Sequence, residues 1–125
     1  MDYQNFGEFL QSKREEKQVT LRSMAEMLGY SAPFLSDVEK DRRNPPDIDK
    51  LMKISDILAL SVEEQNTMMN LAGKKRDTIP PDVAEYAKHD YISHALRTAI
   101  ELDAGEEDWL LLVEELKKRK SRIEG

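Results

Sequence analysis

The stretch "TLRSMAEMLGYSAPFLSDVEK", residues 20–40, contains two short helical patterns separated by a very short turn. Thr20 and Ser31 suit N-cap positions, because a hydroxyl can accept a hydrogen bond from a free backbone N–H of the first helical turn. Gly29 suits the left-handed residue that ends the first helix. Pro33 lies in the first turn of the second helix, where its missing N–H costs little. The stretch therefore predicts a helix, a tight turn and a second helix.

A basic cluster follows the second of these helices. Lys40, Arg42 and Arg43 stand directly before Asn44-Pro45-Pro46, and the residue before a proline is displaced from the α region, so the helix must stop here. Two helices joined by so short a turn cross at a steep angle, and the second can then enter the major groove of DNA. Cations at its end could contact phosphates.

Helical patterns also fill the rest of the chain, and no stretch alternates like a half-buried strand. We expect an all-α protein in three parts: a domain over residues 1–73, a charged, proline-bearing linker over residues 74–82, and a helical region over residues 83–125. The expected helices of the first domain begin near Tyr3, at the caps Thr20 and Ser31, and at the further caps Asp47 and Ser61, with Gly73 ending the fifth.

The composition limits what the protein can do. It has no cysteine among 125 residues, so disulfides and thiolate metal sites are excluded. The start "MDYQNFGEFL" lacks the layout of a signal peptide and no run approaches the length of a membrane span, so we expect a cytoplasmic protein without a membrane contact. Residues 1–76 carry 12 Lys+Arg and 13 Asp+Glu, net −1, whereas residues 77–125 carry 7 and 12, net −5.

Catalytic and metal-binding patterns are not found in the sequence. His89 and His94 are five residues apart, off the i, i+4 spacing that two ligands on one helical face need. The serines and acids form no arrangement typical of catalysis, and no glycine-rich phosphate loop occurs. We therefore expect no enzyme, no metal and no cofactor.

Residues 6–72 resemble the Cro/C1-type (XRE) helix-turn-helix regulators of bacteria and phage. The resemblance implies a lambda-repressor-like domain of four or five helices, here with a small helical extension, and it implies a structural pair between Arg14 and Glu39. The other matching positions are the small residue in the second helix, the turn glycine, the serine within the recognition helix and the Asn-Pro after it: Ala25, Gly29, Ser36 and Asn44-Pro45.

The resemblance makes the helix from Ser31 to Lys40 the DNA-reading helix. Ala32 and Pro33 could pack on a thymine methyl, and Ser36 could donate to a base or accept from one. Asp37 could accept from a cytosine amino group, or it could repel phosphate. Phosphate contacts are expected from the nearby cations, because the motif around them fits; the alternative for Arg42 and Arg43 is a plain solvated turn. The expected DNA-binding set is Arg22, Ser31, Ala32, Pro33, Ser36, Asp37, Lys40, Arg42 and Arg43.

The last helix has an apolar stripe with two alternative explanations. Trp109 with Leu110, Leu111 and Leu112 could pack on the two preceding helices, or could form a dimer interface. A homodimer would suit double-stranded DNA with paired half-sites. We therefore expect a sequence-specific transcriptional regulator, a repressor. The alternative is a protein-interaction module, antitoxin-like or regulator-binding, that uses the acidic C-terminal region.

Overall fold

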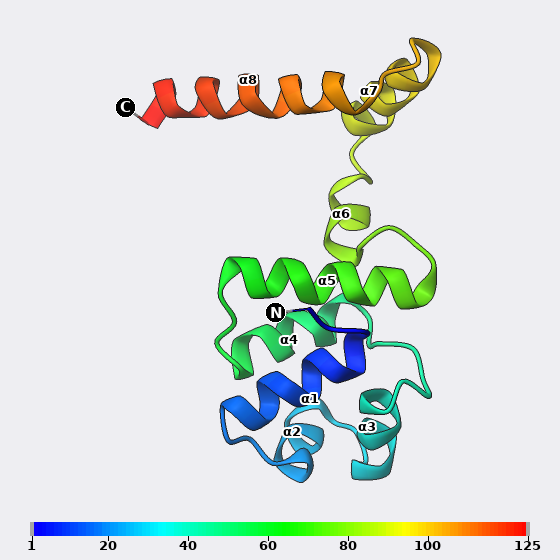
Figure 1. Cartoon of the computed structure of the whole chain (residues 1–125), viewed down its shortest axis with the longest axis vertical. Helices are drawn as coiled ribbons and strands as arrows, with labels where there is room; N and C mark the ends of the chain where they lie inside the picture. The colour runs from blue at the N-terminus through cyan, green and yellow to red at the C-terminus, as the bar shows by residue number, and fades with distance from the viewer. Residues whose placement is uncertain (1, 125) are drawn as a thin grey trace. The chain divides into compact units, whose positions relative to one another are not determined.

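The computed structural model describes residues 2–124, and within them the backbone forms eight helices and no strand. The predicted all-α class is confirmed. In this described range, no helix combines the length and the apolar character that a membrane span requires. Figure 1 follows the helices from the N-terminus in blue to the C-terminus in red. They are α1 (Phe6–Glu16), α2 (Leu21–Leu28), α3 (Ala32–Glu39), α4 (Ile48–Ile57), α5 (Val62–Arg76), α6 (Pro81–Tyr86), α7 (Asp90–Glu101) and α8 (Glu106–Glu124).

The chain divides into two compact units, Met1–Glu85 and Tyr86–Gly125. The first unit holds α1 to α5 and all but the last residue of α6, and its first five helices confirm the lambda-repressor-like five-helix domain. Its helix α1 contacts both α3 and α5, and α2 contacts α3 and α4; Figure 1 shows α1 between α5 and the α2–α3 pair. The division falls between residues 85 and 86, later than the linker that the sequence placed at 74–82.

The core of the first unit is built from one apolar face of each of its five helices. Burying a large aliphatic or aromatic side chain contributes about 1.5–3 kcal/mol, so this cluster is the main source of the unit's stability. The fully buried apolar residues are Phe6, Phe9, Leu10, Met24, Ala25, Leu28, Leu35, Val38, Leu51, Ile54, Leu58, Met68, Met69 and Ala72.

The four N-caps predicted for α2 to α5 are confirmed. Each cap side chain accepts a hydrogen bond from the backbone N–H three residues later, as an N-cap requires. The distances from N–H donor to cap oxygen are 3.1 Å at Thr20, 3.2 Å at Ser31, 3.4 Å at Asp47 and 3.1 Å at Ser61. Helix α1 begins later than the predicted Tyr3, because Asn5 caps it by accepting from the backbone N–H of Glu8 at 2.8 Å.

The predicted end of the fifth helix at Gly73 is wrong. Helix α5 continues to Arg76, and the left-handed residue that ends it is Asp77, with φ of 57°. Gly73 serves packing instead: a Cβ there would lie 2.9 Å from the backbone of Pro80, where the chain folds back against the helix. The first three residues of the predicted linker are therefore the last turn of α5.

The second unit has no core of its own among the residues whose side chains are described. No side chain from residue 86 to residue 121 is buried. The apolar stripe of α8 is accordingly open, and Leu111 is 64% exposed and Leu112 56% exposed. The first explanation of this stripe, burial on the preceding two helices, is therefore not what the structure contains.

An ion pair joins α1 to α5 in the first unit. Lys13 Nζ lies 2.6 Å from Glu64 Oε2 and 3.2 Å from Glu16 Oε2. The hydrogen bond from Lys13, with a second from the backbone of Ser61, lowers the pKa of Glu64 from 4.5 to about 2. A depressed carboxyl pKa stabilises the folded chain above the unfolded pKa and loses this contribution as pH falls through the folded pKa.

We therefore expect Glu64→Gln to lower the free energy of unfolding at pH 7, and this difference from the wild type to shrink from about pH 4.5 towards pH 2. Urea unfolding between pH 7 and pH 2 measures it. Glu63→Gln is the matched control, because Glu63 lies on the same turn, is exposed, and makes no ion pair in the described structure. A constant gap between Glu64→Gln and the wild type across this range would contradict the expectation.

Candidate nucleic-acid interface

The turn between α2 and α3 consists of three residues with distinct roles. Gly29 has φ of 76°, the left-handed conformation that glycine adopts without strain. The backbone N–H of Tyr30 donates to the carbonyl of Ala25 at 2.8 Å and closes α2. Ser31 then caps α3 by accepting from the N–H of Phe34 at 3.2 Å. The backbone N–H groups of Gly29 and Tyr30 are therefore paired locally, with carbonyl groups of α2.

The C-terminal end of α3 is fixed to α1 by a buried ion pair. Arg14 Nε donates to Glu39 Oε2 at 2.8 Å and Arg14 Nη2 donates to Glu39 Oε1 at 3.0 Å, the bidentate geometry of a strong pair. A third donor, Arg14 Nη1, reaches the carbonyl of Val19 at 2.9 Å. The hydrogen bonds that Arg14 donates to Glu39 also raise the pKa of Arg14. Removing one partner of such a buried pair costs roughly 3–5 kcal/mol.

A glycine of α1 allows the close approach that this pair needs. A Cβ at Gly7 would lie 2.3 Å from the carbonyl oxygen of Glu39 and 2.6 Å from that of Val38. Gly7 and Arg14 are seven residues apart, two helical turns, and so share the face of α1 that meets α3. Sequence reasoning missed Gly7, because a glycine within a helical pattern carries no local sign of its distant partner.

A lysine of α4 supports the turn from the other side. Lys50 Nζ donates to the carbonyl of Leu28 at 2.7 Å and lies 5.5 Å from the centre of the Tyr30 ring. The carbonyl of Leu28 belongs to the last residue of α2, where carbonyl groups lack partners within the helix. The cation also suits the negative end of the helix dipole.

The residues expected to read or anchor DNA lie on and around α2 and α3 with different degrees of exposure. Arg22, Ser31, Pro33 and Lys40 are exposed, whereas Ala32, Ser36 and Asp37 are partly exposed. The hydroxyl of Ser31 already accepts its capping hydrogen bond, so its first role is to begin α3. Side-chain ion pairs join three of the expected residues to one another: Asp37, Arg42 and Arg43.

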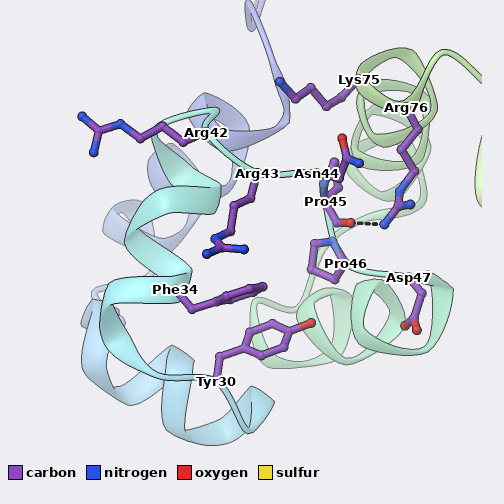
Figure 2. A pocket seen from close by; sticks show the side chains of 10 residues that line it. All are labelled: Tyr30, Phe34, Arg42, Arg43, Asn44, Pro45, Pro46, Asp47, Lys75 and Arg76. Atoms are coloured by element: carbon purple, nitrogen blue, oxygen red, sulfur yellow. Dashed lines mark hydrogen bonds between the residues drawn. The ribbon is translucent and has the colours of Figure 1, made fainter.

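Asp37 lies between the two arginines that follow α3. Arg42 Nη1 is 3.6 Å from one Asp37 oxygen and Arg43 Nε is 3.7 Å from the other. Exposed pairs of this kind contribute only about 0–1 kcal/mol, so a phosphate can replace the carboxylate as partner. The Arg43 guanidinium also lies 4.8 Å from the centre of the Phe34 ring, a cation–π contact that sequence reasoning missed. In Figure 2 Arg43 points towards this ring, whereas Arg42 points away from it.

A basic cavity opens between α3 and the end of α5. Its volume is about 600 Å³, and Figure 2 shows the side chains that line it. Tyr30 and Phe34 form its aromatic wall, and Arg43 faces the cavity from the loop after α3. Lys75 and Arg76 approach from α5. Neither cation was among the expected DNA-binding residues, because the run Lys74-Lys75-Arg76 was interpreted as linker. Within residues 2–124 no group of three His, Asp or Glu side chains is placed to hold a metal ion.

The geometry is that of a helix-turn-helix domain, and comparison with known proteins agrees. Residues 10–65 match the helix-turn-helix family model. Two relatives from Mycobacterium tuberculosis, strains CDC 1551 and H37Rv, are each described as an uncharacterized HTH-type transcriptional regulator. Each is 42% identical over 57 residues, which make up 46% of this chain and 40% of the relative. A chain of the solved SinR protein/SinI protein complex aligns with 23% identity and a TM-score of 0.45, over 93% of this chain and 98% of that chain.

The match of residues 10–65 to the helix-turn-helix family model confirms the resemblance to the Cro/C1-type regulators. The match spans about 40% of the length of the two curated relatives.

The contact at Gly7 gives a direct test of how α3 is held. We expect Gly7→Ala to lower the free energy of unfolding by about 1–3 kcal/mol or more, because the new methyl group collides with backbone that cannot rotate away. The matched control is Gly105→Ala, where a Cβ meets nothing within 4 Å and a change within about 0.5 kcal/mol is expected. Urea unfolding followed by circular dichroism measures both. A Gly7→Ala protein as stable as the wild type would show that α3 lies further from α1.

Proposed function

We propose that the protein is a sequence-specific DNA-binding regulator of transcription that acts as a repressor, with α3 in the major groove. The observation that carries this proposal is the distribution of charge over the helix N-termini. Each of α1 and α4 to α8 has an acidic residue in its first turn, whereas α2 and α3 have none. A helix N-terminus free of acids presents N–H groups and a positive dipole end, which favour phosphate.

The cations around these two helices support the same orientation. Arg22 is exposed in the first turn of α2, and Lys40, Arg42 and Arg43 are at or just beyond the end of α3. Arg42 is 67% exposed and Arg43 53% exposed, so their guanidinium groups are accessible to a ligand. The chain is acidic overall but places these four cations around α2 and α3, which suits binding to a polyanion.

Base reading is assigned to the exposed side of α3. Ala32 and Pro33 would pack on thymine methyl groups, and Ser36 would donate to or accept from a base edge. Asp37 has the arginines as partners, so we assign it to orienting Arg42 and Arg43 rather than to a cytosine. Occupancy of a promoter by such a domain would block polymerase access, and this is the mode of repression that we propose.

The test of DNA binding begins with selection of bound fragments from genomic DNA by the purified protein. Binding to a selected fragment should weaken steeply with salt, and the double variant Arg42→Ala with Arg43→Ala should lower the slope of log K against log salt by up to about two. Arg97→Ala, an exposed cation of the second unit, should leave the slope unchanged. Enrichment of no fragment at low salt, or an affinity independent of salt, would count against the proposal.

We propose further that the second unit pairs two copies of the chain. None of its apolar side chains over residues 86–121 is buried, and a groove of about 720 Å³ between α7 and α8 is lined by Ala99, Trp109, Leu111 and Leu112, among others. Exposed apolar surface of this extent is typical of an interaction site. A second copy is the occupant that the charges favour. Helix α8 begins with Glu106, Glu107 and Asp108 and carries Lys117, Lys118, Arg119 and Lys120 near its end, so two antiparallel copies related by a twofold axis bring acids against bases.

Sedimentation equilibrium tests this pairing. The wild type should be a dimer, and Leu111→Glu with Leu112→Glu should be a monomer that keeps the unfolding transition of the first unit. Glu101→Gln, an exposed change on α7, should leave the dimer intact. The leucine variant should also bind two half-sites on one DNA fragment more weakly than the wild type. A wild type that stays monomeric at high micromolar concentration would overturn the dimer and leave the apolar face to the alternative, a different protein partner.

A further inference from the structure

The last turn of α5 holds both ends of the α3–α4 loop, residues 41–46. Lys75 Nζ donates to the carbonyl of Asp41 at 3.2 Å and lies 3.2 Å from the Asp41 carboxylate. The next residue, Arg76, donates through Nη2 to the carbonyl of Pro45, the hydrogen bond drawn in Figure 2. Two consecutive residues of one helix therefore hold the segment that contains Arg42 and Arg43.

This loop needs external support because its own backbone supplies little. Asp41 has φ of 63°, a left-handed conformation that costs energy for a residue with a Cβ. Pro45 and Pro46 have no backbone N–H to donate, and both are buried. The hydrogen bonds from Asp41 N to Val38 O at 3.1 Å and from Arg42 N to Asp37 O at 2.9 Å fix only the start of the loop to α3.

Lys75 and Arg76 differ from their neighbour Lys74. Lys74 is exposed, and within the described residues no hydrogen bond or ion pair joins it to the loop, although it contributes the same charge to the same helical turn. All three cations suit the negative end of the α5 dipole. Of the three, Lys75 and Arg76 donate hydrogen bonds to the loop, so their contacts with it are more specific than a favourable interaction with the helix end.

We propose that Lys75 and Arg76 are positioning residues for DNA binding. They hold the α3–α4 loop so that Arg42 and Arg43 are presented to the phosphates, and they contact no DNA themselves. A loop held in its bound conformation loses less conformational freedom on binding, which raises affinity without adding a contact. This inference rests on the proposed DNA-binding function and extends it to a helix that lies outside the helix-turn-helix segment.

A double-mutant cycle tests the inference on a DNA fragment selected as above. The first arm is Lys75→Gln with Arg76→Gln, the second is Arg42→Ala with Arg43→Ala, and the third combines all four changes. We expect the first arm to weaken binding about tenfold, a coupling within the range of residues that act together. The combined variant should bind within about twofold of the second arm. Once Arg42 and Arg43 are replaced, Lys75 and Arg76 have no phosphate-binding side chains left to position. Lys74→Gln, the matched control, should stay within about twofold of the wild type.

A single substitution distinguishes positioning from simple electrostatics by the sign of its effect. Asp41→Asn removes a negative charge beside the phosphate anchors, so electrostatics alone predicts tighter DNA binding. Positioning predicts weaker binding, because Lys75 loses its carboxylate partner, while asparagine still accepts the left-handed conformation. Circular dichroism and the unfolding midpoint confirm that each variant is folded at the temperature of the binding assay.

Three outcomes overturn the inference. The first is that Lys75→Gln with Arg76→Gln binds DNA as tightly as the wild type. The second is that the loss of affinity in the four-residue variant equals the product of the losses in the two double variants. The third is that Asp41→Asn binds DNA more tightly than the wild type. The second outcome would mean that Lys75 and Arg76 contact DNA independently. All three leave the proposed DNA-binding function standing. A wild type that binds no DNA at low salt removes the proposed function itself, and this inference with it.

Discussion

The buried pair between Arg14 and Glu39 is the interaction on which the rest of the first unit depends. It satisfies both carboxylate oxygens of Glu39 and three donors of Arg14, so neither charge is left uncompensated in the core. It fixes the end of α3 against α1 at the place where Gly7 removes the steric barrier. The orientation of α3, and therefore of every side chain that α3 exposes, follows from this contact rather than from the turn alone.

The charges around α2 and α3 differ from those of the chain as a whole. The chain as a whole is acidic, yet α2 and α3 begin without acids and cations follow α3. The acids near the cations have assigned partners: Asp37 faces Arg42 and Arg43, and Asp41 faces Lys75. Net charge is therefore a poor guide to what this chain binds, because the electrostatic potential that a ligand meets is local.

The two units obtain their stability from different sources. The first buries a contiguous set of apolar side chains from five helices. The second has amphipathic helices with no buried side chain over residues 86–121. Short helices in water are only marginally stable unless their apolar face packs against another surface. Pairing of two copies through this unit would stabilise it and would at the same time bring two recognition helices onto one DNA duplex.

The sequence by itself determined that the first unit has five helices, the caps Thr20, Ser31, Asp47 and Ser61, and the turn at Gly29, because these depend on contacts within a few residues of chain. It did not determine where α1 begins or where α5 ends. It determined the Arg14–Glu39 pair only through family resemblance. Only the tertiary structure decided the roles of Gly7, Gly73, Lys75 and Arg76. A glycine kept for close approach looks like a helix terminator until its partner is known, as Gly73 and Pro80 demonstrate. Lys75 and Arg76 contact the α3–α4 loop across more than 30 residues of chain, and local pattern carries no information about contacts at that separation.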